Sequence, residues 1–254
     1  ETAVHVSCSD GIGRWTIANE RRRNALDQAG WRAISKAVSA LESESARVII
    51  VSGEGAHFCA GADISEFDTV RADAKSARIY EDDNVAAFDA LANATMPTVA
   101  EIRGTCFGGG LGLAAACDIR LAASDAQFAV PAAKLGLAYP ADSMDMLAKA
   151  VGAQLIRKML FAATVENAAT MLNSGFLLST SEEADLLHEV TTLAASIAQG
   201  APLSHAANKL SLLAKTSDDI AEARTAGDAT FESKDYREGR AAFAERRKPN
   251  FGGV

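Results

Sequence analysis

Short apolar segments alternate with longer amphipathic segments in the first half of the chain. Residues 47–51 (RVIIV) and 98–102 (TVAEI) are compact apolar runs, typical of strands that are buried on both faces. Residues 65–92 between them are typical of helix, and a short helix over 113–117 precedes a strand at 119–122. Because parallel strands are joined by helical crossovers, this alternation predicts an α/β fold with a parallel sheet.

The chain begins with a pattern of a different period. Residues 3–17 contain two short alternating segments around Asp10-Gly-Ile-Gly13, which predicts a β-hairpin. Apolar residues then recur at helical spacing up to about Leu41, and we expect Asp27 to cap that helix at its N-terminus. The N-terminal part therefore predicts a hairpin joined to a helix.

Strand signals fade after about Leu147. Four stretches there are typical of helices, and they cover residues 147–161, 165–174, 182–200 and 202–245. An amphipathic stretch without strands needs a partner for its apolar face. We therefore predict a core over residues 1–200 and a C-terminal helical segment over residues 201–254.

Charge and cysteine usage argue against several functions. The 254 residues are 48% hydrophobic and carry a net charge of −8, which suits one large core and disfavours a nucleic-acid partner. Four scattered cysteines show no metal-ligand spacing, so we expect packed thiols and no metal. No run approaches the ~18 apolar residues that span a bilayer. The first residues also lack a signal-peptide layout, so we expect a cytoplasmic protein without a membrane partner.

Two segments rich in small residues lie between an expected strand and an expected helix. They are residues 57–64 (HFCAGADI) and 104–112 (GTCFGGGLG). Small residues let a ligand approach the backbone closely, and the first N–H groups of a helix have no internal partner. Such donors suit a developing negative charge. Neither segment has the spacing of a P-loop, a dinucleotide-binding turn or a nucleophile elbow.

Taken in this order, the two segments resemble the signatures of the crotonase superfamily, the enoyl-CoA hydratase/isomerase family. The second signature extends over residues 96–118 (MPTVAEIRGTCFGGGLGLAAACD), and weaker similarity covers nearly the whole chain. The resemblance implies a crotonase (ClpP-like) fold, a ββα-superhelix core with a C-terminal helical trimerisation segment. It also implies a homotrimer or a dimer of trimers that binds an acyl-CoA thioester. No cofactor is implied, since coenzyme A is part of the substrate.

The resemblance assigns roles to individual positions. It implies that the N–H groups of Ala62 and Gly109 form an oxyanion hole for the thioester oxygen. Residues implied to bind the substrate are Arg23, Ala25, Ala60, Asp63, Ile64, Phe107, Gly108 and Pro131. Arg23 belongs to the basic run of residues 21–23, from which a family member's basic residue approaches the CoA phosphates. Without the resemblance, this run reads as solvated surface charge.

The sequence departs from the family where hydratases carry two glutamates. Those positions are Gly112 and Ala132, and neither side chain can transfer a proton. The two-glutamate hydration is therefore not expected here. Tyr139 and Asp142 are tentative catalytic replacements near the expected pocket. Asp142 also suits the N-cap or first turn of a helix that begins near Ser143.

Three functions stay open on this basis. The first is an acyl-CoA lyase or isomerase with non-standard acids. The second is another reaction of the superfamily, such as thioester hydrolysis or decarboxylation, which depends more on the oxyanion hole. The third is an acyl-CoA binder without turnover. The retained oxyanion hole favours the first two, and the missing glutamates favour the last two over hydration.

Overall fold

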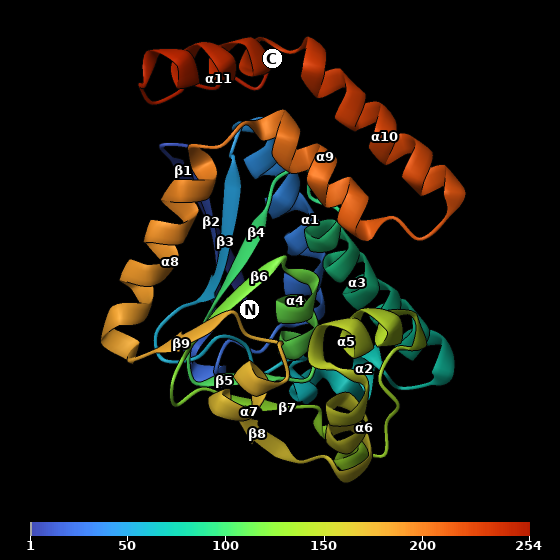
Figure 1. Cartoon of the computed structure of the whole chain (residues 1–254). Coiled ribbons are helices and arrows are strands. Elements are labelled where there is room, and N and C mark those ends of the chain that lie inside the picture. Colours follow the sequence, from blue (N-terminus) through green and yellow to red (C-terminus); the bar gives the residue numbers. More distant parts are fainter. Residues whose placement is uncertain (1) are drawn as a thin grey trace.

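A computed structural model describes residues 2–254. Within these residues one six-stranded sheet has the order β1-β2-β3-β4-β6-β9, and a second sheet has the order β5-β7-β8 (Figure 1). The strands of the larger sheet are Ala3–Ser9, Ile12–Ala18, Val48–Gly53, Thr98–Ile102, Ile119–Ala123 and Ser179–Ser181. The strands of the smaller sheet are Thr105–Phe107, Gln127–Ala129 and Val165–Asn167.

Strand direction confirms the predicted topology. β1 and β2 form the predicted antiparallel hairpin, turning at Asp10 and Gly11, which both have positive φ (53° and 75°). Two such residues make the type of turn whose twist matches that of a hairpin. From β2 to β9 every neighbouring pair in the larger sheet is parallel. The alternation of apolar runs and helices therefore predicted the parallel sheet correctly.

The helices fall into two groups. The first group is α1 (Gln28–Ser43), α2 (Phe67–Val70), α3 (Ala74–Ala92), α4 (Gly109–Ala116), α5 (Met144–Val151), α6 (Ala153–Ala162), α7 (Ala168–Asn173) and α8 (Glu183–Ala198). The second group is α9 (Pro202–Leu213), α10 (Ser217–Glu232) and α11 (Lys234–Glu245). Asp27 caps α1 as predicted, since its Oδ1 accepts a hydrogen bond of 2.7 Å from the N–H of Gly30.

Both faces of the larger sheet are covered. Ile49 and Val51 of β3 pack into the main core with α1, α3 and α4, whereas Val48 and Ile50 pack against α8 on the opposite face. Figure 1 shows α8 alone on one side of the sheet and α1, α3 and α4 on the other. Successive strand side chains point to opposite faces. This arrangement explains why the run over residues 47–51 does not alternate between apolar and polar residues.

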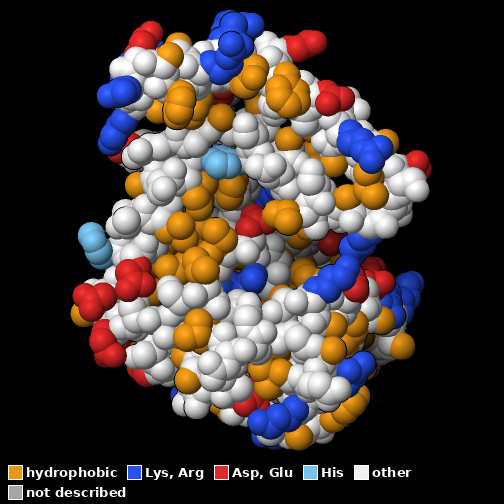
Figure 2. Space-filling model, viewed as in Figure 1, with side chains coloured by type: hydrophobic (Ala, Val, Ile, Leu, Met, Phe, Trp, Pro, Cys, Tyr) orange, Lys and Arg blue, Asp and Glu red, His pale blue; other side chains and the backbone are white. Residues whose placement is uncertain are grey.

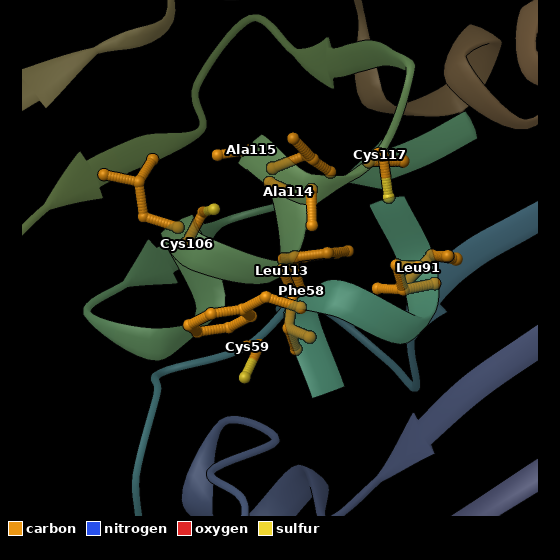
Figure 3. Packing of buried hydrophobic residues seen from close by; sticks show 14 of the residues in the cluster. Phe58, Cys59, Leu91, Cys106, Leu113, Ala114, Ala115 and Cys117 are labelled. Atoms are coloured by element: carbon orange, nitrogen blue, oxygen red, sulfur yellow. The ribbon is translucent and has the colours of Figure 1, made fainter. Parts of the chain in front are cut away.

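Helix α4 lies at the centre of the main core. Its residues from Gly110 to Ala116 are all buried. Cys59, Cys106 and Cys117 lie among the buried side chains around it (Figure 3). Burial raises the pKa of the Cys59 and Cys117 thiols to about 12, so these cysteines are protonated packing residues at neutral pH.

Several predicted helices were wrong at their boundaries. Residues 65–92 are mostly helical as predicted, but the helix is interrupted, because α2 ends at Val70 and Asp73 begins α3 with a capping box to Ser76. The stretch 147–161 divides into α5 and α6 at Gly152, whose φ of 92° is left-handed. Left-handed backbone cannot continue a helix.

The C-terminal half also differs from the prediction. Residues 165–167 form β8 instead of the start of a helix, and β9 was missed. The stretch 202–245 divides into α9, α10 and α11 because Thr216 and Ser233 cap new helices. Strands of three residues are too short to show a period of two. The predicted division at residue 200 falls between α8 and α9, and two separate domains stay a prediction.

One partly buried ion pair attaches the C-terminal segment to the core. Lys209 of α9 is 6% exposed, and its Nζ lies 2.8 Å from Oδ2 of Asp118. The same ammonium group donates to the carbonyls of Leu91 and Met96. Beyond α9, Figure 1 shows α10 and α11 extending over one end of the molecule.

Candidate active site

The two small-residue segments run side by side. The N–H of Cys59 donates to the carbonyl of Thr105 (3.0 Å), and the N–H of Phe107 donates to the carbonyl of Cys59 (2.9 Å). On the other side, Leu26 accepts from the N–H of Asp63 and donates to the carbonyl of Gly61, each over 2.8 Å. Residues 59–63 therefore lie between two neighbouring segments, like a strand within a sheet.

This pairing fixes the direction of the Ala62 N–H group. Leu26 bonds to the residues on either side of Ala62, so the N–H of Ala62 points away from Leu26. Gly109 is the first residue of α4, where an N–H has no intrahelical acceptor. Within residues 2–254 neither N–H donates to a backbone carbonyl.

Glycine brings these two backbones together. A Cβ on Gly61 would lie 2.8 Å from the carbonyl oxygen of Phe107 and 3.0 Å from the nitrogen of Gly109. Gly61 also has a φ of 93°, in the left-handed region that side chains disfavour. The sequence predicted close approach of a ligand to these segments, whereas the contact at Gly61 is between the two segments themselves.

One cavity lies in front of the two N–H groups, with about 640 Å³ of empty space including its mouth. Its lining contains seven of the predicted site residues: Ala60, Ala62, Ile64, Gly108, Gly109, Pro131 and Tyr139. It also contains Ala132, one of the two hydratase-glutamate positions, and residues that no sequence signal assigned: Phe67, Arg71, Asn84, Phe88, Leu135, Leu137, Ala138 and Pro140. Most of the lining is apolar, as a site for an acyl chain requires.

The cavity contains little that can transfer a proton. In the part of the chain that the structure describes, its lining includes no aspartate, glutamate or histidine. Tyr139 is the one phenol, and its hydroxyl lies 3.4 Å from the carbonyl oxygen of Gly108. Burial raises the pKa of Tyr139 above its ordinary value of 10.0, so it stays a hydrogen-bond donor at neutral pH.

Asp142 is a correction to the sequence prediction. Its side chain is 65% exposed, and it lies 3.9 Å from Arg78 outside the cavity. It occupies a 3-10 turn, Ala141–Ser143, that leads into α5. Asp142 therefore lies just before Ser143, the N-cap of α5, rather than at that cap or in the first turn of α5. The direction of this turn keeps the carboxylate away from the two N–H groups.

The remaining predicted binding residues lie around the cavity without lining it. Ala25 is buried, and Phe107 is partly buried behind Gly108. Arg23 is exposed, and its carbonyl accepts the N–H of Ala60 over 2.9 Å. Asp63 begins the 3-10 turn Ile64–Glu66 by accepting the N–H of Ser65.

Asp63 also carries an ion pair that the sequence did not assign. Nη1 of Arg22 lies 2.6 Å from Oδ1 of Asp63. Burial acts to raise the pKa of Asp63, but hydrogen bonds from Ser65 and Arg22 outweigh it and hold that pKa below its usual range. Of the basic run, Arg22 is thus engaged with the protein, and Arg23 extends into solvent.

Comparisons with known proteins show the family of this chain. The model of the enoyl-CoA hydratase/isomerase family matches residues 7–254. A probable enoyl-CoA hydratase of Mycobacterium bovis is 34% identical over 259 residues, which cover 99% of this chain and 100% of that relative. A probable enoyl-CoA hydratase of Bacillus subtilis is 32% identical and covers 99% of both chains.

Solved structures show the same architecture. An enoyl-CoA hydratase/isomerase family protein from Hyphomonas neptunium superposes with a TM-score of 0.93 at 31% identity, covering 99% of this chain and 98% of its own. The arrangement of strands and helices is therefore the crotonase fold. The chain belongs to the enoyl-CoA hydratase/isomerase family.

Two further findings concern membrane spans and metal sites among the described residues. No helix within residues 2–254 is long and apolar enough to cross a bilayer. In the same range, no three His, Cys, Asp or Glu side chains are grouped so that they could hold a metal ion.

Proposed function

We propose that this protein binds an acyl-CoA thioester and polarises its carbonyl oxygen between the N–H groups of Ala62 and Gly109. One observation carries the proposal: both residues line the same cavity, and neither N–H has a backbone acceptor among residues 2–254. Negative charge on the thioester oxygen develops in enolate formation and in acyl transfer. Removing one donor from such a pair typically costs about 3 kcal/mol of transition-state stabilisation.

The reaction proposed is not the hydration that uses two glutamates. Gly112 and Ala132 occupy those positions, and the cavity lining offers Tyr139 as its one neutral proton donor. A base that removes a proton next to the carbonyl is absent from the described lining. Decarboxylation needs no such base, because the departing CO₂ leaves its electron pair in an enolate that the two donors stabilise. We therefore favour decarboxylation, or acyl-CoA binding without turnover, over hydration.

Coenzyme A enters this proposal as part of the substrate, and no other cofactor is required. Arg23 is the residue proposed to approach the CoA phosphates, because it is exposed beside the segment that carries Ala60. A guanidinium group pairs well with phosphate oxygens. Arg22 is less suited, since Asp63 already holds it.

We also propose that α9, α10 and α11 pair with other copies of the chain in a trimer or a dimer of trimers. Leu212, Phe231 and Phe243 of these helices are 86%, 64% and 88% exposed. Figure 2 shows hydrophobic side chains gathered over the end of the molecule where these helices lie. Large exposed apolar side chains on one segment favour a protein partner.

The oxyanion proposal is tested without knowing the reaction. Pentanoyl-CoA labelled with ¹³C at its carbonyl is bound to the protein, and the carbonyl stretch is recorded by infrared difference spectroscopy. Two hydrogen bonds weaken the C=O bond, so the band is expected at lower wavenumber than in buffer. Ala62→Pro deletes one donor at a position whose N–H makes no backbone hydrogen bond.

Ala62→Gly is the matched control, because it keeps the N–H. The expected result is a reduced shift in Ala62→Pro and a retained shift in Ala62→Gly. Circular dichroism and the oligomer size must match those of the wild type in both variants. A bound carbonyl with the frequency of free thioester would show that the two groups do not polarise it.

A further inference from the structure

Two polar side chains in the cavity have no part in the function proposed above. Arg71 follows directly after α2, and Asn84 lies in the middle of α3. Nε of Arg71 and Nδ2 of Asn84 are both buried and have no hydrogen-bond partner among residues 2–254. Asn84 is 5% exposed. Buried donors without partners are costly, so their presence in a ligand cavity points to a ligand that supplies acceptors.

Arg71 also lacks a counter-ion among the described residues. Its guanidinium carbon lies 4.6 Å from the ring centre of Phe67 and 4.7 Å from that of Tyr80, and no carboxylate lies within ion-pair distance. The nearby carboxylate of Glu66 is used elsewhere, since it accepts the N–H of Gln28 over 2.8 Å. The two rings therefore hold a cation in place without neutralising it.

A chain of aromatic contacts connects Arg71 with Gly109, one of the two proposed oxyanion donors. The ring of Trp31 packs directly against Gly109, and its Nε1 donates to the hydroxyl of Tyr80 over 3.1 Å. The ring of Tyr80 in turn lies under Arg71. Tyr80 and Asn84 are four residues apart on α3, so they share one face of the helix. Arg71 and Asn84 thus both neighbour Tyr80, and they line the same cavity as Gly109.

We propose that Arg71 and Asn84 bind a carboxylate at the far end of the acyl chain, so that the substrate class is the CoA thioester of a dicarboxylic acid. This inference rests on the acyl-CoA site proposed above. A carboxylate accepts two hydrogen bonds from a guanidinium group and has lone pairs left for the Asn84 amide. A neutral acyl chain of the same length would leave both groups unpartnered.

Calorimetry tests this inference by measuring the binding of pairs of unreactive acyl-CoA thioesters. Glutaryl-CoA and adipyl-CoA are compared with pentanoyl-CoA and hexanoyl-CoA, which have the same number of carbons. The wild type is expected to bind at least one dicarboxylic member about tenfold or more tightly than its neutral match, and to lose this preference with the terminal methyl ester. In Arg71→Met the preference is expected to disappear because only the dicarboxylic thioester weakens.

Two further variants separate effects on the proposed carboxylate site from general effects on acyl-CoA binding. Asn84→Asp keeps the shape of the side chain and places a carboxylate beside Arg71, so it is expected to weaken glutaryl-CoA and adipyl-CoA selectively. Arg78→Met is the matched control, because Arg78 is 60% exposed and lies outside the cavity lining. It is expected to bind every thioester as the wild type does.

The outcomes distinguish the two proposals. Equal binding of dicarboxylic and neutral thioesters by the wild type would overturn this inference and leave the acyl-CoA site standing. An equal loss of all thioesters in Arg71→Met would also overturn it, because Arg71 would then contact the CoA part. No binding of any acyl-CoA by the wild type would overturn the proposed function and this inference with it.

Discussion

The hydroxyl group of Tyr139 occupies the space beside Gly112 that a side chain at position 112 would need. The ring of Phe88 fills the same space from α3. Tyr139 and Phe88 therefore fill the space that a glutamate side chain at position 112 would occupy. Restoring the missing glutamate would require all three positions to change together.

Gly112→Ala is expected to lower the free energy of unfolding by about 1–3 kcal/mol, because the added Cβ overlaps Tyr139 and Phe88 in a close-packed region. Gly112→Glu is expected to cost more and to give no hydration of crotonyl-CoA. Urea unfolding measures the stability, and absorbance of the enoyl thioester measures the hydration.

Gly227→Ala is the control for this prediction. Gly227 lies inside α10, and a Cβ added there would meet no other atom within 4 Å. Alanine at this position is therefore expected to stabilise the helix by up to about 1 kcal/mol. If Gly112→Ala were as stable as Gly227→Ala, Tyr139 would not fill this space in solution.

In Tyr139→Phe, the free energy of unfolding is expected to fall less steeply as pH rises above 10. Burial raises the pKa of Tyr139 in the folded state, so above pH 10 the unfolded state loses that proton first. The stability that the neutral phenol contributes is complete below pH 10 and is lost as pH rises toward the folded-state pKa. The buried thiols and Tyr80 add to this slope equally in both proteins. Denaturant midpoints at about pH 8 and pH 10.5 test the difference, and identical slopes would contradict the burial of Tyr139.

Lys209→Met is expected to destabilise the protein by about 2 kcal/mol. The change leaves the carbonyls of Leu91 and Met96 without their buried donor and removes the partner of Asp118. Lys215→Met is the control, since the pair of Lys215 with Asp145 is exposed and is worth about 1 kcal/mol or less. Thermal unfolding of both variants gives the comparison. Equal effects would mean that Lys209 is solvated.

Phe243→Glu is expected to weaken association of the chains, because Phe243 belongs to the segment proposed to form the trimer contacts and is 88% exposed. Sedimentation at several protein concentrations measures the change. Phe161→Glu is the matched control, with 80% exposure on α6 outside the C-terminal segment. A wild-type protein that stays monomeric at every concentration would remove the basis of this proposal.

Local signals were predicted well from the sequence. The hairpin turn at Asp10 and Gly11 and the cap at Asp27 depend on neighbours only a few residues away. The strands β5, β7, β8 and β9 were missed because three residues cannot show a period. Their pairing depends on segments that are distant in the chain.

The candidate site also has residues with a local sequence signal and residues without one. The small residues pointed to the two segments and the family resemblance to Ala62 and Gly109 within them, because both are local patterns; both residues line the cavity. Asp142 was placed wrongly, since one 3-10 turn decides which way its side chain points. Arg71 and Asn84 carried no local signal at all. They reach the cavity because the segment after α2 and the middle of α3 pack beside it.

The sequence alone determined the family, the two small-residue segments and the absence of carboxylates at Gly112 and Ala132, because each of these is a statement about residue identity and short spacing. Only the tertiary structure decided that Tyr139 fills the space beside Gly112, and that Arg71 lies against two rings in the same cavity without a counter-ion among the described residues. Side-chain direction and pairing follow from how separate elements pack. No pattern within one element records that packing.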